Sequence, residues 1–154
     1  MGRSWQKIAW LPLLILFFPI ALVFGVLWLV FWLLAAFLLL TAVWLAWCPR
    51  GRNVLVVYSN SPIWQTWFEQ RALPALGSRA VVLNWSERKQ WTSSSLAVLL
   101  FRVFGGTENF NPFMMVFRPL WWPRTFRFYR AFHDFKHGKP EKVEQMWSEV
   151  LKAV

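Results

Sequence analysis

The chain has 154 residues and a formal net charge of +10, because 17 lysines and arginines outnumber 7 acidic residues. A basic balance of this size is typical of proteins that meet anionic lipid headgroups or nucleic acid. The single cysteine excludes an intrachain disulfide and any cysteine-rich zinc site.

The N-terminal third of the chain predicts a membrane anchor, since the forty residues from 8 to 47 carry no charged side chain. Roughly 20 apolar residues cross a hydrocarbon core about 30 Å thick, whereas one straight helix of forty residues would be about 60 Å long. The stretch therefore favours a helical hairpin of two spans, about residues 8–24 and 26–47, with a turn near Gly25, which adopts positive φ easily. A single long helix, tilted or kinked at Pro19, is the alternative.

The orientation follows from the basic side chains that flank this stretch, which are Arg3, Lys7, Arg50 and Arg52. Lysine and arginine next to a span favour the cytoplasmic side, so a hairpin predicts that both termini are cytoplasmic. Trp28 would then lie at the opposite interface, where tryptophan is enriched. The predicted organisation is an integral membrane anchor over residues 1–49 and a cytoplasmic domain over residues 50–154. Because the spans contain no charge, nothing indicates an ion path or a proton relay.

The remaining residues follow a pattern of alternating strands and helices. Fifteen of the 17 basic side chains and all 7 acidic ones lie here, so this part carries +8 of the net charge. Apolar runs rich in β-branched residues predict strands at residues 53–58, 80–85, 113–117 and 124–129. Helices are expected at residues 62–73, 96–104 and from 140 onward, because serine and proline residues open them.

The predicted order is βαβαββα, in which strands separated by helices imply a parallel pair and the last two strands an antiparallel hairpin. This α/β order resembles the thioredoxin-like fold over residues 53–154. The resemblance implies an active motif at the start of the first helix, where residues 59–62 read Ser-Asn-Ser-Pro. It also implies a cis-proline before the third strand, where Pro112 stands. A truncated Rossmann-like or flavodoxin-like domain is the competing fold.

The thioredoxin-like resemblance brings no redox chemistry to this chain. The exchange reaction of that family needs a C-x-x-C pair, and the chain has no cysteine after Cys48. Without a sulfur to form the mixed disulfide, thiol–disulfide exchange in the domain is excluded. The resemblance therefore implies a redox-inactive relative.

Three polar residues after the first predicted strand, Ser59, Asn60 and Ser61, are the candidate ligand-binding site. They open a predicted helix, where backbone N–H groups can bind a phosphate or a carboxylate. The simpler interpretation is helix capping. A serine nucleophile would need a positioned base, for which the chain offers only His133 and His137. No catalytic residue is therefore assigned.

The two histidines are also the only imidazole groups that could bind a metal. His133 and His137 have the i, i+4 spacing that presents two ligands on one face of a helix. Residues 132–139 instead predict the end of a strand and a polar loop, with no third ligand nearby. We therefore expect no metal site and no cofactor.

A segment that interleaves basic and aromatic residues is the strongest functional signal. The predicted partner or lipid interface consists of Arg118, Trp121, Trp122, Arg124, Arg127 and Arg130. Exposed tryptophans in a hairpin loop are costly unless they meet lipid or protein, and arginine with tryptophan is enriched at interface hot spots. Phe126 and Phe128 are expected to face the core instead. Single-stranded nucleic acid uses the same residue types, but a membrane anchor disfavours that partner.

These patterns predict a non-catalytic accessory or scaffolding subunit of a membrane protein complex. Its expected partners are other membrane subunits, a second copy of the chain, or anionic lipid headgroups. The alternative is a membrane-bound enzyme or a binding domain for an anionic small molecule at the helix N-terminus over residues 59–61.

Overall fold

The computed structural model describes the backbone of residues 11–106 and 111–154, and the side chains of residues 17–106 and 111–154. The chain divides into two compact units, residues 1–38 and residues 39–154. The second unit begins before the predicted boundary at residue 49, so the segment from Leu39 to Arg50 belongs to the α/β domain as well as to the apolar stretch.

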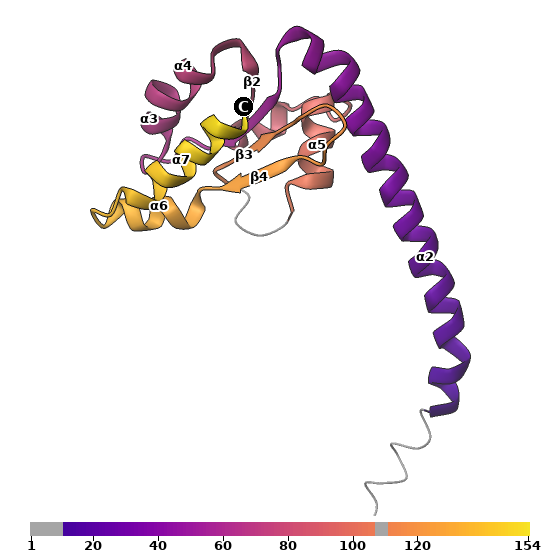
Figure 1. Ribbon diagram of the computed structural model, residues 1–154. Coiled ribbons are helices and arrows are strands. Elements are labelled where there is room, and N and C mark those ends of the chain that lie inside the picture. The colour runs from indigo at the N-terminus through magenta and orange to yellow at the C-terminus, as the bar shows by residue number, and fades with distance from the viewer. Residues whose placement is uncertain (1–10, 107–110) are drawn as a thin grey trace, which may run out of the picture. The chain divides into compact units, whose positions relative to one another are not determined.

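One unbroken helix, α2 (Leu11–Ala42), occupies the place of the two predicted spans (Figure 1). The turn predicted near Gly25 is not observed, so the hairpin gives way to its alternative, a single long helix. A glycine inside a helix costs only about 1 kcal/mol relative to alanine, which the flanking leucines and phenylalanines offset. Pro19 also lies within the helix, as prolines do in membrane-spanning helices.

Two short turns end the apolar segment. A π turn over Val43–Trp47 follows α2, and a 3-10 turn over Cys48–Arg50 follows the π turn. Gly51 then adopts a left-handed conformation with φ of 70°, which glycine accepts without steric cost. The chain reverses there and enters the first strand.

The domain is built on a four-stranded sheet of order β2-β1-β3-β4. Its strands are β1 (Val54–Tyr58), β2 (Ala80–Asn84), β3 (Phe113–Val116) and β4 (Arg124–Arg127). β1 pairs in parallel with β2 and antiparallel with β3, and β3 pairs antiparallel with β4. The predicted parallel pair and the predicted antiparallel hairpin are both confirmed, because long apolar runs with turn residues between them predict strands well.

Five helices belong to the domain: α3 (Gln65–Trp67), α4 (Leu73–Leu76), α5 (Leu96–Phe104), α6 (Tyr129–Lys136) and α7 (Glu141–Ala153). A π turn over Phe68–Ala72 joins α3 to α4. Short 3-10 turns, Gly77–Arg79 and Trp85–Gln90, flank β2. The predicted bounds of α5 are confirmed, and Ser95 caps it by accepting a hydrogen bond from the Val98 N–H.

The first helical segment differs from its prediction at both ends. It begins at Gln65 instead of Pro62, because the carbonyl of Ser61 accepts hydrogen bonds from the N–H groups of Trp64 and Gln65 and so forms a turn first. It also continues past Pro74, where it was expected to end. Pro74 stands at the start of α4, directly after the π turn over Phe68–Ala72, and a proline is tolerated in the first turn of a helix.

The prediction for residues after β4 was wrong. A strand to residue 129 and then a polar loop were expected, but the chain forms the helix α6. Phe128, Ala131 and Phe132 are buried together on one side, with the i, i+3 and i+4 spacing of a helix. The helical pattern is only two turns long and is interrupted by charged residues, so the sequence pattern did not predict this helix.

The sheet separates two hydrophobic clusters, because successive residues of a strand face opposite sides. The first core contains Val54, Val56 and Met114 and is covered by α3, α4, α6 and α7. The second core contains Leu55, Val57 and Met115 and is covered by α5 together with side chains from Leu39–Cys48. The end of the apolar helical segment is therefore part of the domain's core.

Candidate functional site

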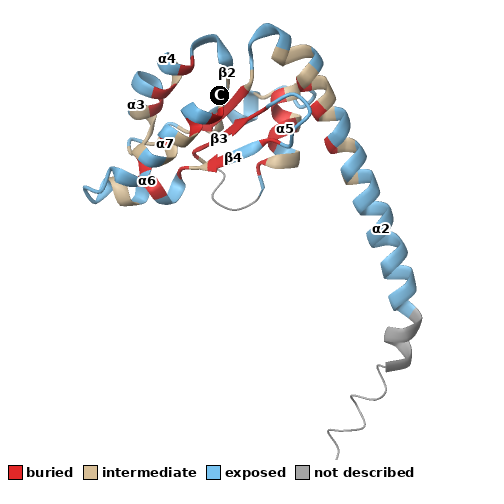
Figure 2. Cartoon of the chain, viewed as in Figure 1, coloured by how far each residue is buried: buried red, intermediate tan, exposed pale blue. Residues whose placement is uncertain are grey.

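The side chains of α2 between Phe17 and Leu38 form an exposed apolar surface (Figure 2). Bulky side chains are exposed on every side of the helix, such as Trp28 at 71% and Phe31 at 66%. A helix that is hydrophobic all round is normally buried in a protein core or in a membrane. The segment Phe17–Arg50 is the one helix among the described residues that is long and apolar enough to cross a membrane.

The part of α2 that precedes the domain is long enough to cross a bilayer. Its residues 11–38 span about 42 Å at 1.5 Å per residue, against a hydrocarbon thickness of about 30 Å. The residues that follow, from Leu39 onward, pack into the second core of the domain. The apolar stretch thus divides into a part that faces outward and a part that the domain itself buries.

The loop between β3 and β4 carries the second exposed apolar surface. Leu120, Trp121 and Trp122 are 84%, 72% and 54% exposed, and we call these three residues the Trp loop. Leu120 adopts a φ of 62°, which is rare for a residue with a side chain. The ring of Trp122 packs edge-on against Phe104, with 5.5 Å between ring centroids.

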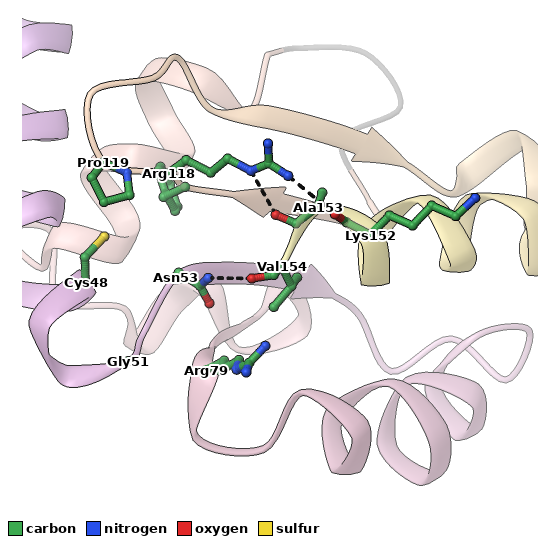
Figure 3. A pocket seen from close by; sticks show the side chains of 10 residues that line it. Cys48, Gly51, Asn53, Arg79, Arg118, Pro119, Lys152, Ala153 and Val154 are labelled. Atoms are coloured by element: carbon green, nitrogen blue, oxygen red, sulfur yellow. Dashed lines mark hydrogen bonds between the residues drawn. The ribbon is translucent and has the colours of Figure 1, made fainter.

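The arginines that were predicted to form one interface lie in different surroundings in the structure. Arg118 donates from Nε to the carbonyl of Ala153, at 3.0 Å, and so caps the end of α7 (Figure 3). Arg124 lies over the ring of Phe126, with 5.3 Å from its guanidinium carbon to the ring centroid. Arg130 is exposed on α6.

Arg124 and Arg127 point to opposite faces of β4. Arg124 shares the face of Phe126, which belongs to the first core. Arg127 pairs in register with Phe113, which belongs to the second core, and its guanidinium lies beside Gly106. Strand alternation therefore splits the predicted basic face into two, and Arg124 stays next to the Trp loop.

A pocket of about 550 Å³ lies where the apolar segment enters the domain (Figure 3). Its wall includes Cys48 and Gly51 from the end of that segment, and Phe117, Arg118 and Pro119 from the base of the Trp loop. The other lining residues are Asn53, Arg79, Lys152, Ala153 and Val154. Three of these ten residues are basic and none is acidic, so the pocket has a positive rim.

Asn53 is the polar residue at the floor of this pocket. Its Nδ2 donates to the carbonyl of Val154 at 3.5 Å (Figure 3), and its Oδ1 is buried without a hydrogen-bond partner. A buried acceptor without a partner costs about 1–3 kcal/mol. The sequence pattern did not identify Asn53 as a pocket residue, because a single asparagine before a strand is usually a turn residue.

The predicted ligand-binding residues lie at the opposite end of β1 and are hydrogen-bonded to neighbouring residues of the domain. Ser59 Oγ accepts from the indole N–H of Trp64 at 3.2 Å, and the Asn60 N–H donates to Ser86 Oγ at 3.0 Å. Asn84 Nδ2 donates to Asn60 Oδ1 at 2.6 Å. The backbone N–H groups that an anion would need are in use, because Asn60 N–H donates to Ser86 Oγ and Ser61 N–H donates to the Ser59 carbonyl at 2.7 Å. Ser61 Oγ accepts from the Ile63 N–H at 3.4 Å, which favours the capping and turn interpretation of residues 59–61.

The two histidines lie side by side, with His133 in α6 and His137 at its C-cap, where a loop was predicted. The ring centroids of His133 and His137 are 5.2 Å apart. They line a small pocket of about 140 Å³ with Ile63, Trp64, Tyr129 and Lys136. The described residues contain no group of three or more histidine, cysteine, aspartate or glutamate side chains placed to hold a metal.

Two ionisable pairs, one exposed and one partly buried, join segments that cover the first core. The Lys142 ammonium bonds the Asp134 carboxylate and lowers its pKa below the usual range. Tyr58 donates from its hydroxyl to Glu69 Oε1 at 3.2 Å, and burial together with that carboxylate raises the pKa of Tyr58. Both pairs join neighbouring elements of the fold, which is a structural role.

The peptide bond between Asn111 and Pro112 is cis, at the place where the thioredoxin-like resemblance implies a cis-proline. Pro112 is buried, and its carbonyl accepts a hydrogen bond from the Phe128 N–H at 2.9 Å. Asn111 Oδ1 is buried without a hydrogen-bond partner.

Comparison with protein-family models, with curated proteins and with solved structures finds no match to this chain. The function is therefore inferred from the chain's own surfaces: the exposed part of α2, the Trp loop, and the pocket between the apolar segment and the base of that loop.

Proposed function

We propose that this protein is a membrane-anchored, non-catalytic accessory or scaffolding subunit whose work is binding. The observation that carries the proposal is the uncharged apolar surface of α2, which is exposed on every side of the helix from Phe17 to Phe31. Soluble monomers rarely expose contiguous apolar patches of more than a few hundred Å². Lipid tails and neighbouring membrane helices cover such a surface at no cost in desolvated polar groups.

In this proposal α2 crosses the bilayer once, with the α/β domain on the cytoplasmic side. The charge of the domain supports this side, because the cytoplasmic leaflet is anionic and attracts basic residues near the membrane by about 1 kcal/mol each. A single crossing places the N-terminus on the other side. Both termini on one side would need the turn near Gly25 that α2 lacks.

We propose in addition that the domain is a thioredoxin-like relative without redox activity. The parallel pairing of β1 with β2 and the antiparallel pairing of β3 with β4 support this relationship. The cis bond before Pro112 supports it as well. The single cysteine, Cys48, cannot form the C-x-x-C pair that the exchange reaction needs, which leaves the fold as a scaffold.

The partners that we propose are other membrane subunits or a second copy of the chain, bound through α2. Ala21 and Gly25, one turn apart, lie in a shallow apolar groove lined also by Phe18, Leu22 and Leu29. Membrane helices approach one another closely where small residues leave such space. This groove is the place at which association is best tested.

The test measures the mass of the full chain extracted from its own membrane in mild detergent. We expect a complex of defined stoichiometry, and we expect Gly25→Leu to weaken it because the added side chain fills the groove. Val23→Leu, which adds bulk outside that groove, is the matched control. A monomer without protein partners, both in detergent and in lipid nanodiscs, would contradict the proposed function.

A further inference from the structure

The Trp loop exposes more apolar surface than folding explains. Leu120 occupies a left-handed backbone position, which costs a residue with a side chain roughly 1–2 kcal/mol. Glycine would take the same position without that cost, and the Leu120 side chain is 84% exposed. The domain therefore gains nothing from a leucine here, and the side chain is available for a contact outside the domain.

The base of the Trp loop is fastened to the end of the apolar segment. Phe117 packs edge-on against Trp47, with ring centroids 6.0 Å apart. The same stretch of loop, Phe117 to Pro119, shares the wall of the pocket with Cys48 and Gly51. The loop thus starts beside Trp47 and Cys48, the last residues of the apolar segment, which pack against the second core.

The charge around this region has one sign. Arg50 and Arg52 follow the apolar segment, and Arg118 and Arg124 stand on either side of the Trp loop. The described acidic residues lie elsewhere along the chain, at Glu69, Glu87, Asp134, Glu141, Glu144 and Glu149. Tryptophan favours the interfacial zone of a bilayer, and arginines near the surface favour anionic headgroups.

We infer that the Trp loop is a second membrane contact, which inserts Leu120, Trp121 and Trp122 into the interface of the bilayer that α2 crosses. Arg124 and the arginines after α2 meet the phosphates of anionic lipids there. The inference rests on the proposed function, since the loop reaches that surface only if α2 holds the domain beside it. The partner of this loop is then an anionic lipid surface instead of another protein.

The experiment places one environment-sensitive fluorophore at a time on the full chain, in a Cys48→Ala background. Labels at Leu120→Cys, Lys139→Cys and Leu27→Cys report on the Trp loop, on the exposed α6–α7 loop and on α2. Each protein is reconstituted in vesicles of phosphatidylcholine alone, or with about a quarter phosphatidylglycerol, and is quenched by lipids that carry nitroxides at shallow or deep positions.

We expect shallow quenching and a blue-shifted emission at position 120 in the anionic vesicles, water-like emission at position 139, and deep quenching at position 27. Arg124→Gln should lower the ratio of docked to free loop about fivefold. This factor corresponds to about 1 kcal/mol, the attraction of one arginine to an anionic surface. Raising the salt concentration should weaken docking as well, because the screening length falls from about 10 Å at 0.1 M to about 3 Å at 1 M.

Each other outcome decides against a specific statement. Water-like emission at position 120 with deep quenching at position 27 would overturn the Trp-loop inference and leave the proposed function standing. Equal quenching at position 120 with and without phosphatidylglycerol would overturn the role of anionic lipid. The absence of deep quenching at position 27 would overturn the proposed function itself.

Discussion

The two faces of the sheet are covered by different parts of the chain. On the first face, α3, α4, α6 and α7 bury the first core with residues from the domain alone. On the second face, the core is buried by α5 together with Leu40 and Val43. These two residues belong to the apolar segment and are 2% and 0% exposed. The difference teaches that this segment is a structural element of the domain as well as an anchor.

This comparison also separates two kinds of apolar helix that look alike in sequence. α5 has nearly no polar residue, yet Ala97, Val98 and Leu100 are buried against the sheet. The exposed part of α2 has the same composition and no protein surface to cover it in this chain. Burial, and not composition, therefore identifies the helix that needs a membrane or a partner.

Removal of the whole apolar segment should have the largest effect on the domain. A fragment of residues 51–154 loses Leu40, Val43 and Trp47, which uncovers one side of the second core. Each large apolar side chain returned to water costs about 1.5–3 kcal/mol, so we expect this fragment to lose cooperative unfolding. A fragment of residues 39–154 should keep it.

Thermal unfolding followed by near-ultraviolet circular dichroism, with both fragments in one mild detergent, checks this prediction. Equal midpoints for the two fragments would show that the second core does not depend on the apolar segment. In that case both faces of the sheet would be stabilised by residues of the domain after Arg50 alone.

A single substitution in the first core should destabilise the domain less than removal of the apolar segment does. Its effect should also be independent of a substitution in the second core. Phe132 is 0% exposed and touches several aromatic rings, so we expect Phe132→Ala to lower the free energy of unfolding by about 3–5 kcal/mol. Leu40→Ala in the second core should lower it by about 2–5 kcal/mol. Because the sheet separates the two sites, the losses should add within about 0.5 kcal/mol.

Urea unfolding of the two single variants and the double variant measures both losses. A clear departure from additivity would mean that the two cores are energetically coupled across the sheet. The two faces could then not be treated as independent contributions to stability.

The cap of α5 should contribute a smaller amount to the second face. Ser95 Oγ accepts a hydrogen bond from the Val98 N–H at 3.3 Å, and loss of such a cap costs about 1 kcal/mol. We expect Ser95→Ala to destabilise the domain by that amount, while Ser94→Ala, at an exposed neighbour, leaves the urea midpoint unchanged. Equal effects of the two substitutions would rule out capping as the cause.

The smallest expected effect is a pH dependence on the first face. Lys142 lowers the pKa of Asp134 in the folded chain, so the pair stabilises the fold above the unfolded pKa of about 3.9. That stability is lost as the pH falls through the lower folded pKa. We expect Asp134→Asn to lower the melting temperature slightly at pH 7 and to match the parent chain in strong acid. A constant difference between the two proteins at every pH would contradict this.

Much of the domain was predictable from local patterns. The strands were found because long apolar runs between turn residues have few alternatives, and α5 was found because Ser95 caps it and Gly105 ends it. The helix α6 was missed, since Phe128 and Phe132 also suit an edge strand and only packing in the first core selects the helix. The turn near Gly25 was wrongly expected, because glycine permits a turn but does not require one.

The candidate site was predictable only in part. Trp121 and Trp122 were expected in an exposed hairpin loop, and they are exposed there. The grouping of Arg124 with Arg127 failed, because the two arginines are three residues apart in β4. Side chains an odd number of residues apart in a strand point to opposite faces of the sheet. No local pattern predicted the pocket around Asn53, since its walls come from four separate parts of the chain, residues 48–53, 79, 117–119 and 152–154.

The sequence by itself determined that the chain has an uncharged segment able to cross a membrane, a basic α/β domain and no thiol chemistry in that domain. These properties depend only on which residues are present and on their local spacing. The tertiary structure alone decided that the end of the apolar segment belongs to the second core and that the Trp loop starts beside it. Such contacts join residues far apart in the chain, and only the packing of side chains against the sheet selects them.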